Sequence, residues 1–315
     1  MQAFILRRFL LAVAAILGVT FVIFAFSSLL GDPRNIFLES PGAAGGYGVS
    51  REVWDELGRK LHLDRPLVVR YVYWLRDLVK GDLGRDLGDG QSIAKKIRQK
   101  APVTARLAVA AWILATLIGV PIGVISAVQR GRVIDYLVRG FALLGQSLPA
   151  FWLGLMGIFL FAVKLHWVPV STPGEGLAVR NFILPAVTLG WLASAGYARL
   201  TRSSMLEVLD SEYIKMARAK GVREWIVIWK HAFRNALIPP MTYSGLLFVG
   251  FLEGSIVVEV IFSWPGLARL AAEAVWTNNF PVLVVVVIVF STMAIVMNFL
   301  VDVAYAYVDP RIRYR

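Results

Sequence analysis

Six long, mainly apolar stretches divide this sequence, and they constrain its fold more than any other feature. A bilayer core about 30 Å thick needs about 20 apolar helical residues to cross it. Each stretch has roughly that length, so we expect an all-α integral membrane protein with six transmembrane helices. The stretches are Phe9–Leu30, Leu107–Val128, Phe141–Val163, Asn181–Ala198, Ile238–Phe262 and Pro281–Val301.

The last stretch contains the run Val282–Val289, which β-propensity alone would assign to a strand. A lone strand in lipid leaves its backbone groups unpaired, at a cost of several kcal/mol per group. We therefore predict a helix, with Pro281 in its first turn and Asn278 or Asn279 capping it.

The composition agrees with a membrane protein. Hydrophobic residues make up 57% of the chain and charged residues 17%, so the apolar surface exceeds what one soluble core could bury. The formal net charge of +12 raises the possibility of nucleic-acid binding. Such binding requires a basic face on a soluble domain, whereas basic residues of membrane proteins gather in cytoplasmic loops. The predicted partner is therefore a lipid membrane, with no nucleic acid.

The positions of Lys and Arg predict the orientation in the membrane. Residues 31–106 also carry many basic side chains, but loops longer than about 60 residues cross largely regardless of charge. We predict that both termini are cytoplasmic and that the first stretch is a retained anchor. The basic residues on the cytoplasmic side are Arg7 and Arg8, Arg130, Arg132 and Arg139, those between Arg199 and Arg234, and Arg311, Arg313 and Arg315.

The long segment before the second stretch has helical spacing of apolar residues, so it is expected to fold. Ile93 and Ile97, beside several lysines, predict an amphipathic helix on the membrane surface. We divide the chain into residues 1–30 (N-terminus and first span), 31–106 (external segment) and 107–315 (core domain with five spans, including a cytoplasmic connection at 199–238).

Several kinds of chemistry have no residues to support them. The chain has no cysteine, so disulfides and thiol chemistry are excluded. No phosphate-binding G-x-x-x-x-G-K-[ST] loop occurs, and neither do the usual hydrolase motifs. His62, His166 and His231 lie in three different connections without metal-ligand spacing. We expect no catalytic residue, metal site or cofactor in this chain.

The most informative segment is the connection between the fourth and fifth stretches. Glu212 to Lys220 predicts a short helix, and Gly221 suits the left-handed residue that ends it. A second helix should follow, with Trp225, Ile228, Trp229 and Ala232 on one face. The alternative on physical grounds is a solvated loop with tryptophans at the membrane interface.

This connection resembles the EAA loop of permeases from the dipeptide/oligopeptide/nickel family of ABC importers. Further matching motifs are spread over the whole chain, and the Gly-Asp-Leu-Gly element with the long external segment resembles the B-type subunit. Asp86 stands where the family has serine. The matching residues are Tyr213, Ala217-Arg-Ala-Lys-Gly221, His231, Arg234, Asn235 and Pro239 in the loop, and Gly31-Asp-Pro33, Leu63-Asp-Arg-Pro66, Gly81-Asp-Leu-Gly84, Glu259, Phe262, Pro265-Gly266 and Asp309-Pro-Arg-Ile-Arg313 elsewhere.

The resemblance implies a type I importer in the bacterial inner membrane. Its partners would be a second permease, two cytoplasmic subunits that bind ATP and Mg²⁺, and an external substrate-binding protein. The EAA helix would sit in an ATPase groove, so that ATP-driven closure moves the attached spans. The residues implied in ATPase coupling are Tyr213, Ala217, Ala219, Lys220, Gly221, His231, Arg234 and Asn235.

The cargo is left open by the sequence. Peptides are the commonest substrate that the resemblance implies, and nickel, opines, oligosaccharides and glutathione are alternatives. Glu253 lies deep in the fifth stretch and Glu259 nearer its outer end, so both are candidates for the translocation path. An ion-coupled secondary transporter would need more acidic residues in the membrane or repeated halves, and an intramembrane enzyme would need a nucleophile and base there.

Overall fold

The computed structural model describes residues 2–29, 55, 58, 59, 62–86, 88–169 and 179–308 of the chain. Across these ranges the regular structure is helical, with one isolated bridge between Arg85 and Ser92. The chain forms two compact units, which are described separately. Unit 1 comprises Met1–Val103 and Gly266–Phe299, and unit 2 comprises Thr104–Pro265 and Leu300–Arg315.

Unit 1 is built around an apolar core between α13, α14 and the start of α5. Ile93, Leu267 and Val286 are fully buried in this core. The valine run Val282–Val289 is helical, as predicted, because it lies within α14. The helices of this unit are α1 (Gln2–Leu29), α4 (Leu67–Val79), the first turns of α5 (Ile93–Val128), α13 (Leu267–Trp276) and most of α14 (Phe280–Val308).

Two expectations for this unit need correction. Ile93 and Ile97 do not form a separate surface helix, because α5 runs unbroken from Ile93 to Val128 and Ile93 is buried against α13 and α14. The predicted cap of α14 is also not formed by Asn279. Its amide nitrogen donates to Asp86 instead, and its Oδ1 has no hydrogen-bond partner. Tertiary contacts therefore override the local capping preference at this end.

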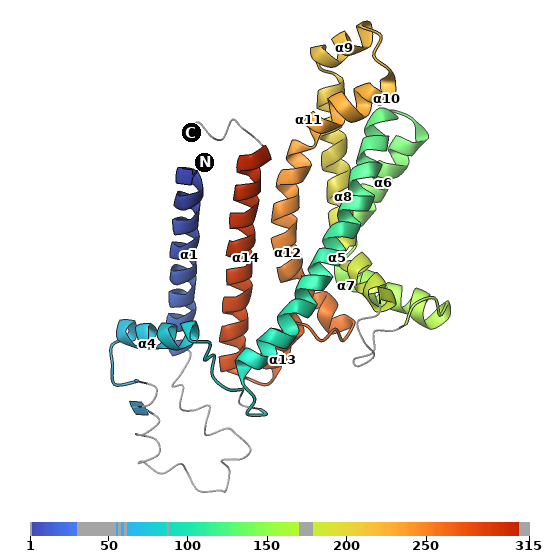
Figure 1. Ribbon diagram of the computed structural model, residues 1–315. Coiled ribbons are helices and arrows are strands. Elements are labelled where there is room, and N and C mark those ends of the chain that lie inside the picture. Colours follow the sequence, from blue (N-terminus) through green and yellow to red (C-terminus); the bar gives the residue numbers. More distant parts are fainter. Residues whose placement is uncertain are drawn as a thin grey trace. The chain divides into compact units, whose positions relative to one another are not determined.

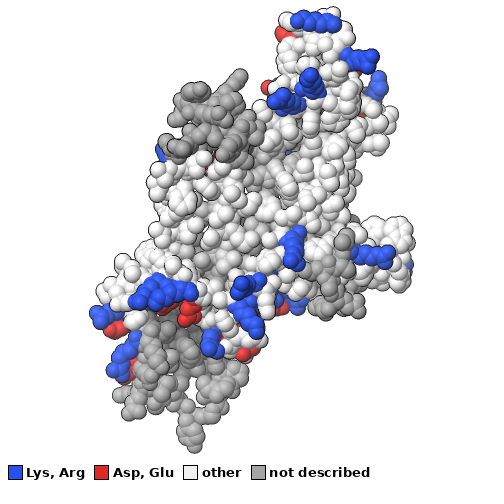
Figure 2. Space-filling model, viewed as in Figure 1, with Lys and Arg blue, Asp and Glu red and all other residues white. Residues whose placement is uncertain are grey.

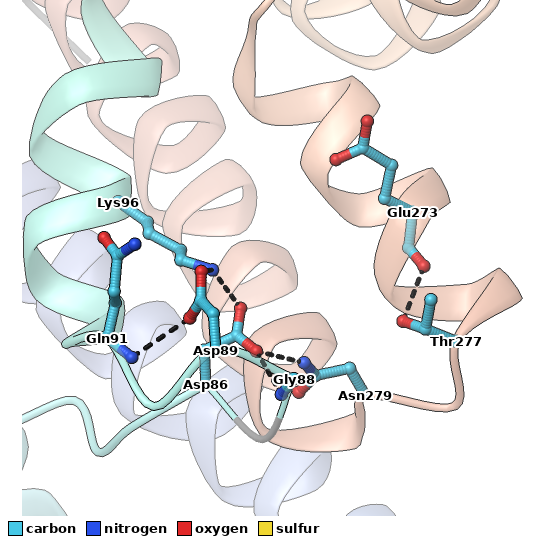
Figure 3. Close-up of polar contacts among 8 residues, drawn as sticks. All are labelled: Asp86, Gly88, Asp89, Gln91, Lys96, Glu273, Thr277 and Asn279. Atoms are coloured by element: carbon cyan, nitrogen blue, oxygen red, sulfur yellow. Dashed lines mark hydrogen bonds and ion pairs between the residues drawn. The ribbon is translucent and has the colours of Figure 1, made fainter. Parts of the chain in front are cut away.

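A buried carboxylate, Asp86, holds the turn before α5 in place. Figure 3 shows it between Lys96 of α5 and Asn279, just before α14. The Gly88 amide and Asn279 Nδ2 each donate to Oδ1 at 2.7 Å, and Lys96 donates to Oδ2. Burial alone would raise the pKa of Asp86, but these three donors hold that pKa below its ordinary value. Lys96 also pairs with Asp89 at 2.7 Å.

Unit 2 is organised around α8, which packs against α6, α7 and α12 (Figure 1). Its residues Leu184, Ala193, Tyr197 and Ala198 are buried within the protein. The elements, besides the rest of α5, are α6 (Val133–Ser147), α7 (Ala150–Gly157), the π-helix η1 (Ile158–Lys164), α8 (Val179–Leu209), α9 (Glu212–Ala219), α10 (Glu224–Ile226), the π-helix η2 (Val227–Phe233), α11 (Arg234–Ala236) and α12 (Ile238–Ile261).

Glycines allow the backbones of α5 and α8 to meet directly. A Cβ atom at Gly119 would lie 2.5 Å from the Ser194 carbonyl oxygen, and one at Gly123 would lie 2.6 Å from that of Ala198. Small residues at such contacts are typical of helix pairs in membranes, where close packing replaces the hydrophobic effect. The two helices are therefore expected to move as one body.

Three described helices are long and apolar enough to cross a membrane: α1, α5 and α14. The number rises to five if two bent helix pairs are each one span. One pair is α6 with α7 and η1, which bend by 103° at Leu148 and Pro149, so the expected stretch Phe141–Val163 is not one straight helix. Leu148 is extended, as is usual for a residue before proline. The other pair, α10–α11 with α12, bends by 50°.

α8, which contains the predicted stretch Asn181–Ala198, is not among these candidates. Its burial between neighbouring helices offers a physical reason. A helix that contacts protein rather than lipid on most sides can carry polar residues such as Thr188 and Ser194, both of which are buried.

Candidate functional site

The predicted helix-turn-helix between α8 and α12 is present, and we call residues 211–236 the coupling bracket. Its first arm, α9, begins at Glu212 after the extended Ser211 and ends at Ala219. Gly221 has a φ of +73°, which confirms the predicted left-handed residue. Its amide donates to the Arg218 carbonyl at 2.9 Å. A Cβ atom there would meet nothing within 4 Å, so only the backbone conformation calls for glycine.

The second arm is helical and the rings of Trp225 and Trp229 lie side by side, but the residues predicted to share one face differ in burial. Val227 and Ala232 are fully buried, whereas Trp225 and Trp229 are 68% and 40% exposed. The prediction assumed 3.6 residues per turn throughout. The arm instead contains the π-helix η2, whose wider turn changes which residues share a face.

A polar clamp joins the two arms. The Tyr213 hydroxyl donates to the His231 carbonyl oxygen at 2.8 Å. Asn235 Nδ2 donates to the Tyr213 hydroxyl at 2.8 Å and to the same carbonyl at 3.0 Å. Three residues that the sequence singled out for coupling, 18 and 22 positions apart, therefore meet at one point. The angle between the arms is fixed by these bonds.

A second contact, which the sequence reasoning missed, closes the bracket beside Gly221. Arg218 forms a forked pair with Glu224, with nitrogen–oxygen distances of 2.7 and 3.2 Å. This hydrogen-bonded carboxylate raises the pKa of Arg218. Opposite charges on either side of a helix-ending glycine were the signal available in the sequence.

The bracket rests on an apolar cluster that connects it to the membrane helices. Ile214 of α9 and Val227 of η2 pack with Val124 of α5 and Met205 of α8, and Ala217 contacts the same cluster. The bracket is therefore packed directly against α5 and α8 rather than joined to them by a loose loop.

The face of the bracket away from this cluster is exposed and basic. Ala219, Lys220 and Arg234, all predicted coupling residues, lie on the surface. Figure 2 shows Lys and Arg atoms gathered on the bracket. A hollow lies between the bracket and the ends of α5 and α8, lined by Ala127, Val128, Arg130, Leu206, Leu209, Asp210, Arg218, Glu224 and Ile228.

A buried carboxylate that the sequence reasoning did not identify, Asp135 of α6, fixes the helices at the base of the bracket. Arg202 of α8 donates to both of its oxygens, at 2.7 and 3.1 Å. Ser126 of α5 and the Gly131 amide donate at 2.7 and 3.0 Å. Asp135 is 1% exposed. A lone acidic residue among the basic residues after α5 was the only sequence signal.

The two acidic candidates for the translocation path differ in what can be said of them. Glu259 of α12 is fully buried and accepts a hydrogen bond from Thr104 Oγ1 at 2.6 Å. The side chain of Glu253 lies outside the part of the chain that the structure describes. Among the described residues, no three His, Cys, Asp or Glu side chains are grouped so that they could hold a metal ion.

Known proteins resemble this chain in sequence and in fold. Residues 119–314 match the family described as "Binding-protein-dependent transport system inner membrane component". The chain belongs to this family. It is accordingly a multi-pass inner membrane permease subunit, whose family is not catalytic. The matched range includes the coupling bracket and the Asp135 cluster.

Relatives match over the full length. The dipeptide transport system permease protein DppB of Escherichia coli K12 is 38% identical and the oligopeptide transport system permease protein AppB of Bacillus subtilis 168 is 36% identical, with 100% of both chains covered in each case. Among solved structures, an inward-facing MetNI methionine ABC transporter has a TM-score of 0.57 at 18% identity, covering 68% of this chain and 96% of that one. This last likeness concerns the fold alone.

Proposed function

We propose that this permease is the B-type subunit of a type I ABC importer that moves di- and oligopeptides into the cell. It would pair with a second permease, two cytoplasmic ATPases and an external binding protein. Full-length relatives named for dipeptide and oligopeptide transport support the peptide cargo. The chain would cross the membrane six times, with both termini cytoplasmic and residues 31–106 external.

The observation that carries this proposal is the construction of the coupling bracket. The clamp of Tyr213, His231 and Asn235 fixes the angle between its arms, and the buried side chains of Ile214 and Val227 join it to α5 and α8. The arrangement suits a lever that converts a push on α9 into rotation of the spans. The exposed face with Ala219, Lys220 and Arg234 would contact the ATPase.

The experiment that tests coupling changes Gly221, because a non-glycine residue there is strained only in its backbone. Gly221→Val should cost about 1–2 kcal/mol locally and misplace α9. We expect normal membrane insertion, with peptide uptake lost while the partner ATPases still hydrolyse ATP. Gly221→Asn is the matched control, since asparagine tolerates the left-handed conformation, and it should retain most uptake. Normal uptake by Gly221→Val would overturn the lever.

The proposed path through the membrane is tested at Glu253. If its carboxylate faces a cationic group of the cargo, such as a peptide amino terminus, Glu253→Gln should lower uptake of cationic peptides while assembly and basal ATPase activity persist. Glu259→Gln is a useful comparison, because buried Glu259 accepts a hydrogen bond from Thr104 and should shape the outer gate instead. Equal uptake of peptides of every charge by Glu253→Gln would leave that residue a structural role.

A further inference from the structure

The helix α4 in unit 1 has one apolar face that is covered and one that is not. Its covered side faces α1, where Tyr71 and Trp74 pack in an aromatic cluster with Phe24. The Tyr71 hydroxyl donates to the Leu17 carbonyl oxygen at 3.0 Å and shares a hydrogen bond of 2.9 Å with Thr20 Oγ1. Figure 1 shows α4 lying across α1. The helix is thus held firmly at one depth along α1.

The apolar arc of α4 extends beyond the side that packs on α1. At about 100° per residue, the arc runs from Trp74 and Leu78 past Tyr71 to Val68, Val79 and Val72. The three valines at its far end are 61%, 81% and 58% exposed. The opposite face carries the charged residues Arg76, Asp77 and Lys80, with the partly exposed Val69 and Tyr73 among them, whereas the guanidinium of Arg70 lies over the Phe24 ring of α1.

The depth of α4 along α1 indicates what covers these valines. The candidate span of α1 is Ile5–Phe26, and only 11% of its most apolar window is buried within the protein, so most of this window is free to face lipid. Thr20 lies six residues before the end of that span, or about 9 Å along the helix axis. A helix attached there lies at the boundary between acyl chains and headgroups, which is 5–10 Å deep for interfacial helices.

We propose that α4 is an interfacial helix whose exposed valine row, Val68, Val72 and Val79, inserts among the acyl chains of membrane phospholipids. Its charged face then meets the headgroups, where Arg76 and Lys80 can bind phosphate oxygens. The helix thereby anchors unit 1 to the bilayer surface. This inference depends on α1 spanning the bilayer and is independent of the cargo.

The test uses single cysteines, which can be introduced without background because the chain has none. Spin labels at Val72→Cys and Val79→Cys are compared in the assembled transporter in phospholipid nanodiscs. Asp77→Cys on the charged face is the aqueous control, and Val22→Cys on the exposed side of α1 is the lipid control. Each label is exposed to oxygen, which concentrates in the bilayer, and to a water-soluble nickel chelate.

We expect both valine positions to show a ratio of oxygen to nickel accessibility severalfold higher than Asp77→Cys and close to Val22→Cys. A ratio equal to that of Asp77→Cys would show that the valine row faces water, and protection from both reagents would show that protein covers it. Either outcome overturns the proposal. Two valine positions are used because Val79, at the end of α4, can be replaced with little effect on packing even if Val72→Cys folds poorly.

Discussion

Asp135 in unit 2 and Asp86 in unit 1 are both buried carboxylates beside a glycine-containing turn, yet their partners differ. Asp135 accepts both nitrogens of the Arg202 fork, along with bonds from α5 and its following turn. Asp86 shares its cation, Lys96, with the exposed Asp89. A guanidinium fork fixes direction as well as charge, whereas an ammonium acts as a point charge.

The difference indicates how firmly each turn must be held. The Asp135 cluster joins α5, α6 and α8 at the base of the coupling bracket, where any change of angle would reach the helices. The Asp86 cluster fastens a turn to the starts of α5 and α14, and it leaves Asn279 Oδ1 without a hydrogen-bond partner. We infer that the first cluster sets geometry and the second mainly supplies attachment.

The largest effect is expected from Asp135→Ala. The substitution leaves Arg202, which is 21% exposed, without its carboxylate, and breaking a buried pair from one side costs about 3–5 kcal/mol. The free energy of unfolding in nanodiscs measures the loss. Asp210→Ala is the matched control, because its pair with Arg130 is exposed on both sides and should contribute no more than about 1 kcal/mol. If both variants lost the same free energy of unfolding, Asp135 would contribute no more to stability than an exposed ion pair does.

An intermediate loss of stability is expected when the guanidinium of Arg202 is replaced by an ammonium group. Arg202→Lys keeps the charge but loses one of two hydrogen bonds to Asp135, which should cost about 1–2 kcal/mol. The reciprocal change, Lys96→Arg, keeps a cation beside Asp86 and Asp89 and should cost clearly less. The free energies of unfolding of the two variants, measured under the same conditions, test this difference. If Lys96→Arg proves the more harmful, the contrast between the clusters is wrong.

The smallest effect is expected on the stability of the protein at low pH. Because the folded-state pKa of Asp86 lies below its unfolded value near 3.9, its contribution to stability is complete above that value. The contribution is lost as the pH falls through the folded pKa. Asp86→Asn should therefore flatten the decline of stability below about pH 4. Asp89, whose pKa is lowered chiefly by the hydrogen bond from Lys96, is exposed, so Asp89→Asn should change the acid profile less.

Much of the candidate site could be predicted from the sequence because it depends on local backbone conformation. Helix α9 and the left-handed Gly221 follow from the order of residues within one turn. The helical state of Val282–Val289 follows from the solvent, since lipid cannot satisfy an unpaired strand. The family resemblance depended on short motifs as well, and it is confirmed by the family match over residues 119–314 together with the full-length peptide-permease relatives.

Only the tertiary structure decided which side chains meet. The sequence gives no spacing rule by which Arg202, 67 positions from Asp135, should be its partner. The buried face of the second arm depends on the π-helix η2, which periodicity at 3.6 residues per turn cannot anticipate. The polar residues Thr188 and Ser194 of α8 are tolerated because neighbouring helices bury them. Local geometry is set by neighbours in the chain, but burial and long-range pairing depend on the packing of the whole fold, and for these the sequence alone was insufficient.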